Sequence, residues 1–157
     1  MKQVLSFVLN GAPVDVVVKP TATLLDVLRE QLYLTGTKRG CDDGDCGTCT
    51  ILMDGEPARA CLTLALTVEG KAITTVEGLA GSDLQPMQKA FLNYGATQCG
   101  FCTPGMLLVA TALLGKNPHP THDEIVYFMS GNLCRCGTYQ EVIDAIQAVA
   151  DGKVKEL

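Results

Sequence analysis

The placement of eight cysteines constrains this chain more than any other feature, because they fall into two separate groups of four. The first group, with spacing C-x4-C-x2-C-x11-C, is Cys41, Cys46, Cys49 and Cys61, and the second, with spacing C-x2-C-x31-C-x-C, is Cys99, Cys102, Cys134 and Cys136. A [2Fe–2S] cluster takes four thiolates, so this count allows two clusters with no cysteine left over. The pattern predicts a protein that moves electrons.

The first group has the spacing of plant-type [2Fe–2S] ferredoxins. One loop would present three thiolates to the two irons, and a neighbouring strand would bring the fourth, Cys61. Gly40, Gly44 and Gly47 would let backbone N–H groups approach the cluster sulfurs. A zinc site is the alternative, but structural zinc usually takes two C-x2-C knuckles, which this loop lacks.

The second group is less specific when taken alone. Its C-x2-C and C-x-C pairs also fit a zinc site, or a redox-active C-x2-C motif. A thioredoxin-like motif would need a βαβ setting, which the surrounding sequence does not indicate. Cluster, zinc and redox-active dithiol therefore remain open from spacing alone.

Charge and hydropathy exclude several functions. The formal net charge is −5, and no basic stripe exists, so nucleic-acid binding is not expected. The N-terminus lacks the features of a signal peptide, and no apolar stretch approaches the roughly 18 residues of a membrane span. We therefore expect a cytoplasmic location, where tight cysteine pairs indicate metal rather than disulfides.

The first half of the chain has the pattern of strands around one helix. Asn10-Gly11 and Asp54-Gly55 are strong hairpin signals, each flanked by apolar residues. Thr21 and Thr23 offer a helix N-cap before a run of helical periodicity. Strands are expected at 4–9, 14–18, 50–53, 58–62 and 72–76, and a helix from 24 to about 33. This order favours a β-grasp arrangement.

The second half changes to helical signals. Thr121 and Glu124 form a capping-box sequence, and Pro104 suits the first turn of a helix. Helices are expected at 85–93, 104–114, 121–129 and 140–150. Each cysteine pair of this half leads into a helix, so the two turns could face each other and share one cluster at two positive helix ends.

These patterns predict an α+β chain, with an N-terminal β-grasp ferredoxin-like domain followed by a C-terminal four-helix bundle domain. The expected division is 1–78 for the plant-type ferredoxin-like domain and 79–157 for the helical [2Fe–2S]-binding domain. No phosphate-binding loop and no nucleophile–base set is present, so no catalytic residue is expected on this chain. The substrate chemistry would belong to a cofactor on another chain.

Three motifs, GCDDGDCGTCT, QCGFCTPGM and GNLCRCGTY, occur together and in this order. Over roughly residues 3 to 150 the chain thereby resembles the small [2Fe–2S] subunit of the molybdenum hydroxylases, the xanthine dehydrogenase/aldehyde oxidoreductase/carbon monoxide dehydrogenase family. The resemblance implies an electron-transfer subunit of a heteromeric oxidoreductase. A large partner subunit would hold molybdopterin, in its dinucleotide form, and electrons would leave to FAD on a further subunit or to another acceptor.

The resemblance also implies roles for particular residues. The second cysteine group would hold a buried cluster near molybdenum, and the first group a more exposed cluster near the acceptor. Gln98 would hydrogen-bond the molybdopterin, and Cys136 would contact the pterin amino group as well as iron.

The electron acceptor and the overall function still have alternatives. The chain has Gly137-Thr138 after Cys136, where many members of that family have the reverse order, so the electron acceptor is undetermined. A free-standing ferredoxin-like carrier and a zinc-stabilised interaction module are the other functions to weigh. His119 and His122 flank a helix cap and are expected on a surface loop.

Overall fold

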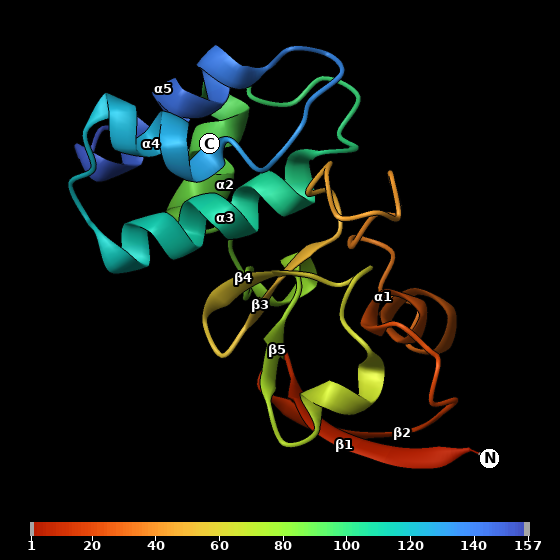
Figure 1. Cartoon of the computed structure of the whole chain (residues 1–157). Coiled ribbons are helices and arrows are strands. Elements are labelled where there is room, and N and C mark those ends of the chain that lie inside the picture. Colours follow the sequence, from red (N-terminus) through yellow and green to blue (C-terminus); the bar gives the residue numbers. More distant parts are fainter. Residues whose placement is uncertain (1, 156–157) are drawn as a thin grey trace.

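The computed structural model describes residues 2–155, which form a sheet half and a helical half stacked on one another (Figure 1). The elements in chain order are β1 (Gln3–Leu9), β2 (Ala12–Val18), α1 (Leu24–Asp26), η1 (Val27–Gln31), β3 (Thr50–Met53), β4 (Glu56–Arg59), η2 (Ala65–Val68), β5 (Ala72–Thr74), η3 (Val76–Gly78), α2 (Pro86–Asn93), α3 (Thr103–Lys116), α4 (His122–Met129) and α5 (Tyr139–Ala150). This arrangement confirms the α+β class, with a ferredoxin-like sheet followed by four helices.

The sheet has the strand order β2-β1-β5-β3-β4. β1 and β5 run parallel, and the other neighbours run antiparallel. The predicted first hairpin is present, with Asn10 and Gly11 at φ values of 50° and 84° in the tight turn. Leu5, Phe7 and Leu9 point into the core, as their alternation predicts.

The first helix begins where expected and ends earlier. Thr23 and Asp26 form a capping box at its start. The helix then widens into the π-helical turn η1 and stops at Gln31, short of the expected end near residue 33. Tyr33 takes a φ of 57°, which no helix can continue, so the chain leaves the helix there.

The second hairpin differs from its prediction in one strand. β4 is Glu56–Arg59, not 58–62, because the Leu62 N–H donates to the Arg59 carbonyl at 3.1 Å and closes a turn. The last strand, β5, is likewise shorter than expected and continues as the 3-10 turn η3. Cys61 therefore lies in a turn after β4 rather than at the end of a strand.

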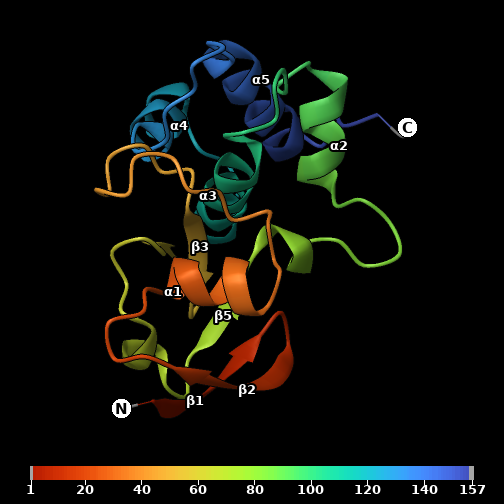
Figure 2. The ribbon, with the colours of Figure 1, turned by 90° about the vertical axis from the view of Figure 1, so that its right-hand side faces the viewer.

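Four helices, α2 to α5, form the second half (Figure 2). The predicted capping box at Thr121 and Glu124 is present, and Pro86 lies in the first turn of α2. The helices enclose a core of their own, in which Phe91, Ile125 and Ile146 are fully buried. Within residues 2–155 no helix is both long enough and apolar enough to cross a membrane.

A small apolar cluster joins the two halves. α3 lies across β3, where Leu108 and Ala112 pack against Leu52 (Figure 1). The loop before β3, which carries three cysteines, rises beside this contact toward the helical half (Figure 2). The packing of α3 on β3 thus brings the two cysteine groups to one side of the junction.

Candidate iron–sulfur centres

The first cysteine group is assembled by one loop and one turn. The loop before β3 supplies Cys41, Cys46 and Cys49, and the turn after β4 supplies Cys61. Cys49 and Cys61 are buried, while Cys41 and Cys46 are half-buried. A Cβ on Gly40 would lie 2.7 Å from the Cys46 sulfur, so the loop leaves room for thiols and little else.

Two contacts link the cysteines of this group in pairs, one between two thiols and one from a backbone N–H to a thiol. Cys49 Sγ and Cys61 Sγ are 3.3 Å apart, and the Cys46 N–H donates to Cys41 Sγ at 3.3 Å. Burial, reinforced by the neighbouring Cys49 thiol, raises the pKa of Cys61 to about 12. Burial would also raise the pKa of Cys46, but hydrogen bonds from Thr48 and from Cys41 outweigh it and lower it to about 7.

The second group is assembled by two turns that lead into helices, as the sequence predicts. Cys102 immediately precedes α3, and Cys134 Sγ lies 3.2 Å from the hydroxyl of Thr138, the residue before α5. Burial opposes ionisation of Cys134, but hydrogen bonds from the Thr138 hydroxyl and backbone prevail and lower its pKa to about 7. The Tyr139 hydroxyl fixes the same turn by accepting the Cys134 N–H at 2.8 Å.

The two turns face each other, and their thiols also form pairs. Burial, and then the hydrogen bond to Cys134, raises the pKa of Cys102 to about 12. The pKa of Cys99 is lowered, first by the Phe101 backbone and second by its hydrogen bond to Cys136. The pairs are therefore Cys102 with Cys134 and Cys99 with Cys136.

This arrangement fits two-iron clusters better than single metal ions. Structural zinc needs four donors around one ion, whereas each iron of a [2Fe–2S] cluster takes two protein thiolates. Two pairs per group supply that donor set.

The exposure of the two groups in the isolated chain is uneven. The resemblance implies that the helical group is buried and the first group more exposed. In this chain Cys99 and Cys136 are exposed, while the first group has no fully exposed thiol. The helical group therefore opens to the surface of the isolated chain through its outer pair, whereas Cys102 and Cys134 of the same two turns are buried.

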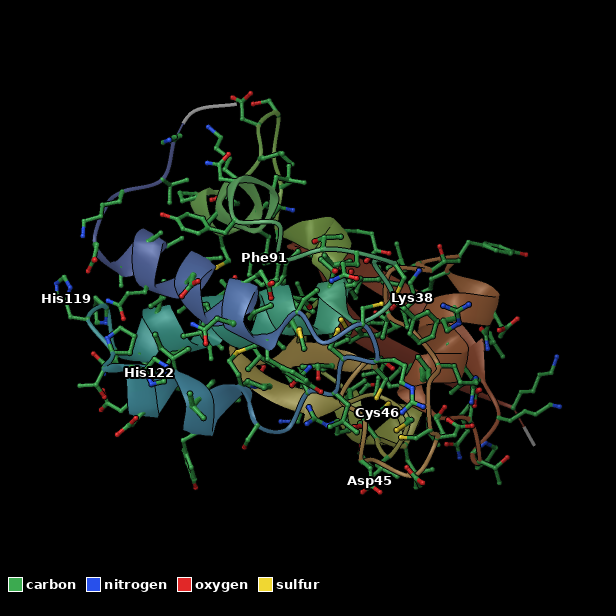
Figure 3. All side chains as sticks on the ribbon, turned by 90° about the horizontal axis from the view of Figure 1, so that it is seen from above. Lys38, Asp45, Cys46, Phe91, His119 and His122 are labelled. Atoms are coloured by element: carbon green, nitrogen blue, oxygen red, sulfur yellow. The ribbon has the colours of Figure 1, made fainter. Side chains whose placement is uncertain are left out.

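Gln98 lies beside this outer pair and is exposed, as is Arg135. Gln98 is thus available to a partner molecule. It directly precedes Cys99 in the sequence. His119 and His122 are exposed and lie at one end of the molecule, well away from Cys46 (Figure 3). They take no part in either centre.

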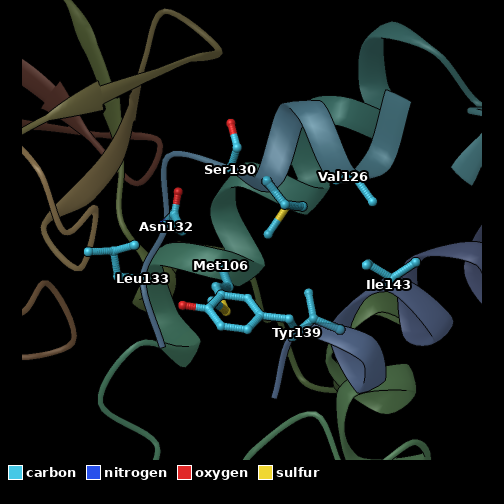
Figure 4. Close-up of a pocket in the computed structure, with 9 residues that line it drawn as sticks. Met106, Val126, Ser130, Asn132, Leu133, Tyr139 and Ile143 are labelled. Carbon is cyan, nitrogen blue, oxygen red and sulfur yellow. The ribbon is translucent and has the colours of Figure 1, made fainter. Parts of the chain in front are cut away.

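Sequence reasoning missed the residues that bind the two centres to each other. Asn132 is buried and donates from Nδ2 to the Gly47 carbonyl at 3.0 Å, and the Leu133 N–H donates to the Cys46 carbonyl at 2.9 Å. The segment that carries both residues passes between the helices and the sheet half, next to an apolar cavity of about 290 Å³ between α4 and α5 (Figure 4). Neither residue type at this spacing signals such a role.

The comparisons with known proteins agree with this geometry. The chain matches the family model described as "2Fe-2S iron-sulfur cluster binding domain" over residues 7–80 and the model described as "[2Fe-2S] binding domain" over residues 75–147. Two [2Fe–2S]-binding domains therefore follow one another along the chain.

Named relatives are the small subunits of a hydroxylase and of a dehydrogenase. The chain is 51% identical over 137 residues to the nicotine 6-hydroxylase small subunit of Paenarthrobacter nicotinovorans, covering 87% of this chain and 83% of that protein. It is 48% identical over 141 residues to the nicotinate dehydrogenase small FeS subunit of Eubacterium barkeri, covering 88% of this chain and 89% of that protein.

A solved structure has the same fold. A chain of quinoline 2-oxidoreductase from Pseudomonas putida 86 superimposes with a TM-score of 0.93 and 51% sequence identity, covering 97% of this chain and 96% of that chain. The fold and the two centres define an electron-transfer protein with two [2Fe–2S] clusters. The chain belongs to the family of small iron–sulfur subunits of the molybdenum hydroxylases.

Proposed function

We propose that this chain is the subunit that carries electrons away from the molybdenum centre of a hydroxylase complex. Two clusters would be bound, one by each group of four thiols. The ligands of the first cluster are Cys41, Cys46, Cys49 and Cys61, and those of the second are Cys99, Cys102, Cys134 and Cys136. The pairing of thiols within each group supports this assignment, because it supplies two donors for each iron.

The exposed outer pair of the helical group carries the proposal. Phe101 is 45% exposed and Leu133 53% exposed beside Cys99 and Cys136. An exposed thiol pair with apolar neighbours is unusual for a structural site in a free protein and is consistent with a face that a partner covers. The partner we propose is the large molybdopterin-binding subunit, with Gln98 and Cys136 contacting the pterin in its dinucleotide form.

The chain's own residues position and insulate the redox groups. When bound, each [2Fe–2S] cluster supplies one-electron redox capacity. Cys99 and Cys136 would face the electron source, and the exposed aspartates of the first cysteine loop would face the acceptor. Asp42, Asp43 and Asp45 surround that second exit with negative charge. We propose FAD on a further subunit, or an external carrier, as the acceptor.

Three further predictions accompany this function. The division into a ferredoxin-like domain at 1–78 and a helical domain at 79–157 is supported by the separate cores of the two halves. A cytoplasmic location stays a prediction from the sequence, as does the absence of nucleic-acid binding.

The first test counts the clusters and looks for the partner. Anaerobically purified protein should contain about four irons per chain and give two distinguishable EPR signals on reduction. When it is co-expressed with the large subunit, the two should elute as one complex. A stable monomer of this chain alone in native extract, with both clusters intact, would instead identify a free-standing carrier.

The second test addresses Gln98. Gln98→Ala in the complete complex should slow reduction of the clusters by substrate and leave their reduction by dithionite unchanged. Gln140→Ala, which changes an exposed glutamine of α5 that bonds Asp144, is the matched control and should change neither. Equal behaviour of the two variants would remove Gln98 from the cofactor contact.

A further inference from the structure

We propose that Arg59 is a positioning residue that fixes the separation of the two iron–sulfur centres and thereby the rate at which electrons pass between them. The inference rests on the proposed function, because it assumes that both groups of thiols hold clusters. Arg59 itself ligates nothing and lies two residues before Cys61, at the end of β4.

The guanidinium of Arg59 reaches across the junction between the two halves. Its Nη2 donates to the Gly131 carbonyl at 2.6 Å, ahead of the second cysteine turn. Its Nε donates to the Gly44 carbonyl at 3.4 Å, inside the first cysteine loop. A single half-buried side chain therefore holds both cysteine-bearing segments, and its planar fork of donors fixes their relative position.

A second, buried set of hydrogen bonds supports this bridge. Arg59 Nη1 donates to the Thr50 hydroxyl at 2.7 Å, and that hydroxyl donates to the Gly47 carbonyl at 2.6 Å. The same carbonyl accepts from Asn132 Nδ2 at 3.0 Å. Thr50 is 1% and Asn132 2% exposed, so water does not compete for these bonds.

Between these two supports lies the direct connection from one centre to the other. The Leu133 N–H donates to the Cys46 carbonyl at 2.9 Å, and Leu133 immediately precedes Cys134. A path from Cys46 to Cys134 thus crosses one hydrogen bond and otherwise follows covalent bonds. One electron at a time would pass from the helical centre, which is oxidised, to the sheet-side centre, which is reduced, with no bond broken and no proton moved.

The junction has no spare room for a different arrangement. A Cβ on Gly131 would lie 2.6 Å from Arg59 Nη2, and a Cβ on Gly47 would lie 2.4 Å from the Gly131 carbonyl. Lysine at position 59 would offer a point charge without the fork, and it cannot reach Gly44, Thr50 and Gly131 together. The separation of the centres should therefore depend on arginine at this position.

The test uses the complete complex carrying Arg59→Lys or Arg59→Met. The matched control is Arg29→Met, because Arg29 also donates to two backbone carbonyls, those of Thr35 and Thr37, but both lie in the sheet half. Three quantities are measured: the magnetic interaction between the two reduced clusters by EPR, the rate of electron passage between them after rapid reduction, and the exchange protection of the Leu133 amide.

We expect both Arg59 variants to keep two clusters, to weaken the magnetic interaction and to lose protection at Leu133. Electron passage should slow severalfold, because the rate of electron transfer between two redox centres falls as their separation grows. Arg29→Met should resemble the unsubstituted protein in all three measurements.

Two results would overturn the inference. One is an unchanged magnetic interaction and Leu133 protection in Arg59→Met. The other is the loss of a cluster in both Arg59 variants, since Arg59 would then be needed to assemble a centre rather than to space two. Failure of the proposed function is distinguishable from either, because it would appear as fewer than two clusters in the unsubstituted protein.

Discussion

The two cysteine groups of this chain solve the same chemical problem by different means. In the sheet half, three of four thiols come from one loop, and the fourth comes from a turn directly after the adjoining hairpin. In the helical half, the thiols come from two turns that α3 and α4 separate along the chain. The first centre is therefore specified mainly by local backbone geometry, and the second depends on the packing of helices.

Their exposure differs accordingly. The loop of the first centre wraps its own thiols, so none is fully exposed, whereas Cys99 and Cys136 open to the surface. A loop can enclose a cluster by itself, but two helix-leading turns enclose only the side that faces the helices. The comparison indicates that this chain encloses the first centre by itself, and it supports the proposal that a partner covers the second.

Removing one buried ligand from each centre should have the largest effect. Cys49→Ser and Cys102→Ser should each lower the iron content from about four to about two per chain, because a serine hydroxyl is a poor replacement for a thiolate. Each variant should lose one of the two EPR signals and retain the other. Loss of both signals from either variant would show that the centres do not assemble independently.

The next largest effect is expected from weakening the apolar contact between the two halves. Leu108→Ala should lower the free energy of unfolding by about 3 kcal/mol, as is typical for a buried leucine. Because Leu108 packs on Leu52 of the sheet, the two halves should then unfold at different urea concentrations. Far-UV circular dichroism and hydrogen exchange would monitor the unfolding of each half.

Leu113→Ala is the control for this experiment. Leu113 is also buried on α3 but packs within the helical core. Its loss should destabilise the helical half by a similar amount without separating the two transitions. Separated transitions in Leu113→Ala and a single one in Leu108→Ala would contradict the assigned contact.

Substituting glycine by alanine tests how closely the two cysteine segments approach each other. Gly47→Ala combines a φ of +71° with a Cβ only 2.4 Å from the Gly131 carbonyl, and should cost about 2 kcal/mol. Gly11→Ala has a φ of +84° but nothing within 4 Å, so it should cost about 1 kcal/mol from backbone strain alone. Urea unfolding measures the loss of stability in both variants. Equal losses would mean that the two cysteine segments move apart to accommodate the added Cβ.

The smallest effects concern the two capping boxes, one in each half. Thr23→Ala in the sheet half and Thr121→Ala in the helical half should each cost about 1 kcal/mol, because each removes the hydroxyl that accepts a backbone N–H at N3. Serine at either position should restore most of the loss. A variant without effect would show that its helix start is held by tertiary packing instead.

The same boxes predict a pH dependence. Hydrogen bonds from the Thr121 backbone and hydroxyl lower the pKa of Glu124. Burial would raise the pKa of Asp26, but hydrogen bonds from Thr23 and the contact with Arg39 outweigh it and lower it. A carboxyl group whose pKa is lower in the folded protein than in the unfolded chain stabilises the fold at any pH above its unfolded pKa of about 4. This stability is lost as the pH falls from there through the folded-state pKa.

Glu124→Gln and Asp26→Asn should therefore reduce the acid sensitivity of stability between about pH 5 and pH 2. Thermal unfolding as a function of pH measures the effect. Asp15→Asn, on the exposed edge strand β2, is the control and should leave the profile unchanged. A profile in Glu124→Gln identical to that of the unsubstituted protein would contradict the assigned hydrogen bonds.

Much of the fold follows from short-range signals. The Asn10-Gly11 turn, the Thr23 and Thr121 caps and the alternation of Leu5, Phe7 and Leu9 were each sufficient to place an element. The errors fall where a backbone contact overrides periodicity. The expected strand at 58–62 ends at Arg59 because its next residues turn back toward Cys49, and the expected helix stops before Tyr33.

The sequence by itself determined the two groups of thiols, the elements that carry them and the kinship with molybdenum hydroxylase subunits, because spacing, turns and caps act over a few residues. The tertiary structure alone decided which thiols pair, which pair faces outward and how the two centres are joined. Arg59 and Gly131 are 72 positions apart, and Gly47 and Asn132 are 85 apart. Contacts of such separation depend on the packing of α3 on β3, so no local pattern records them.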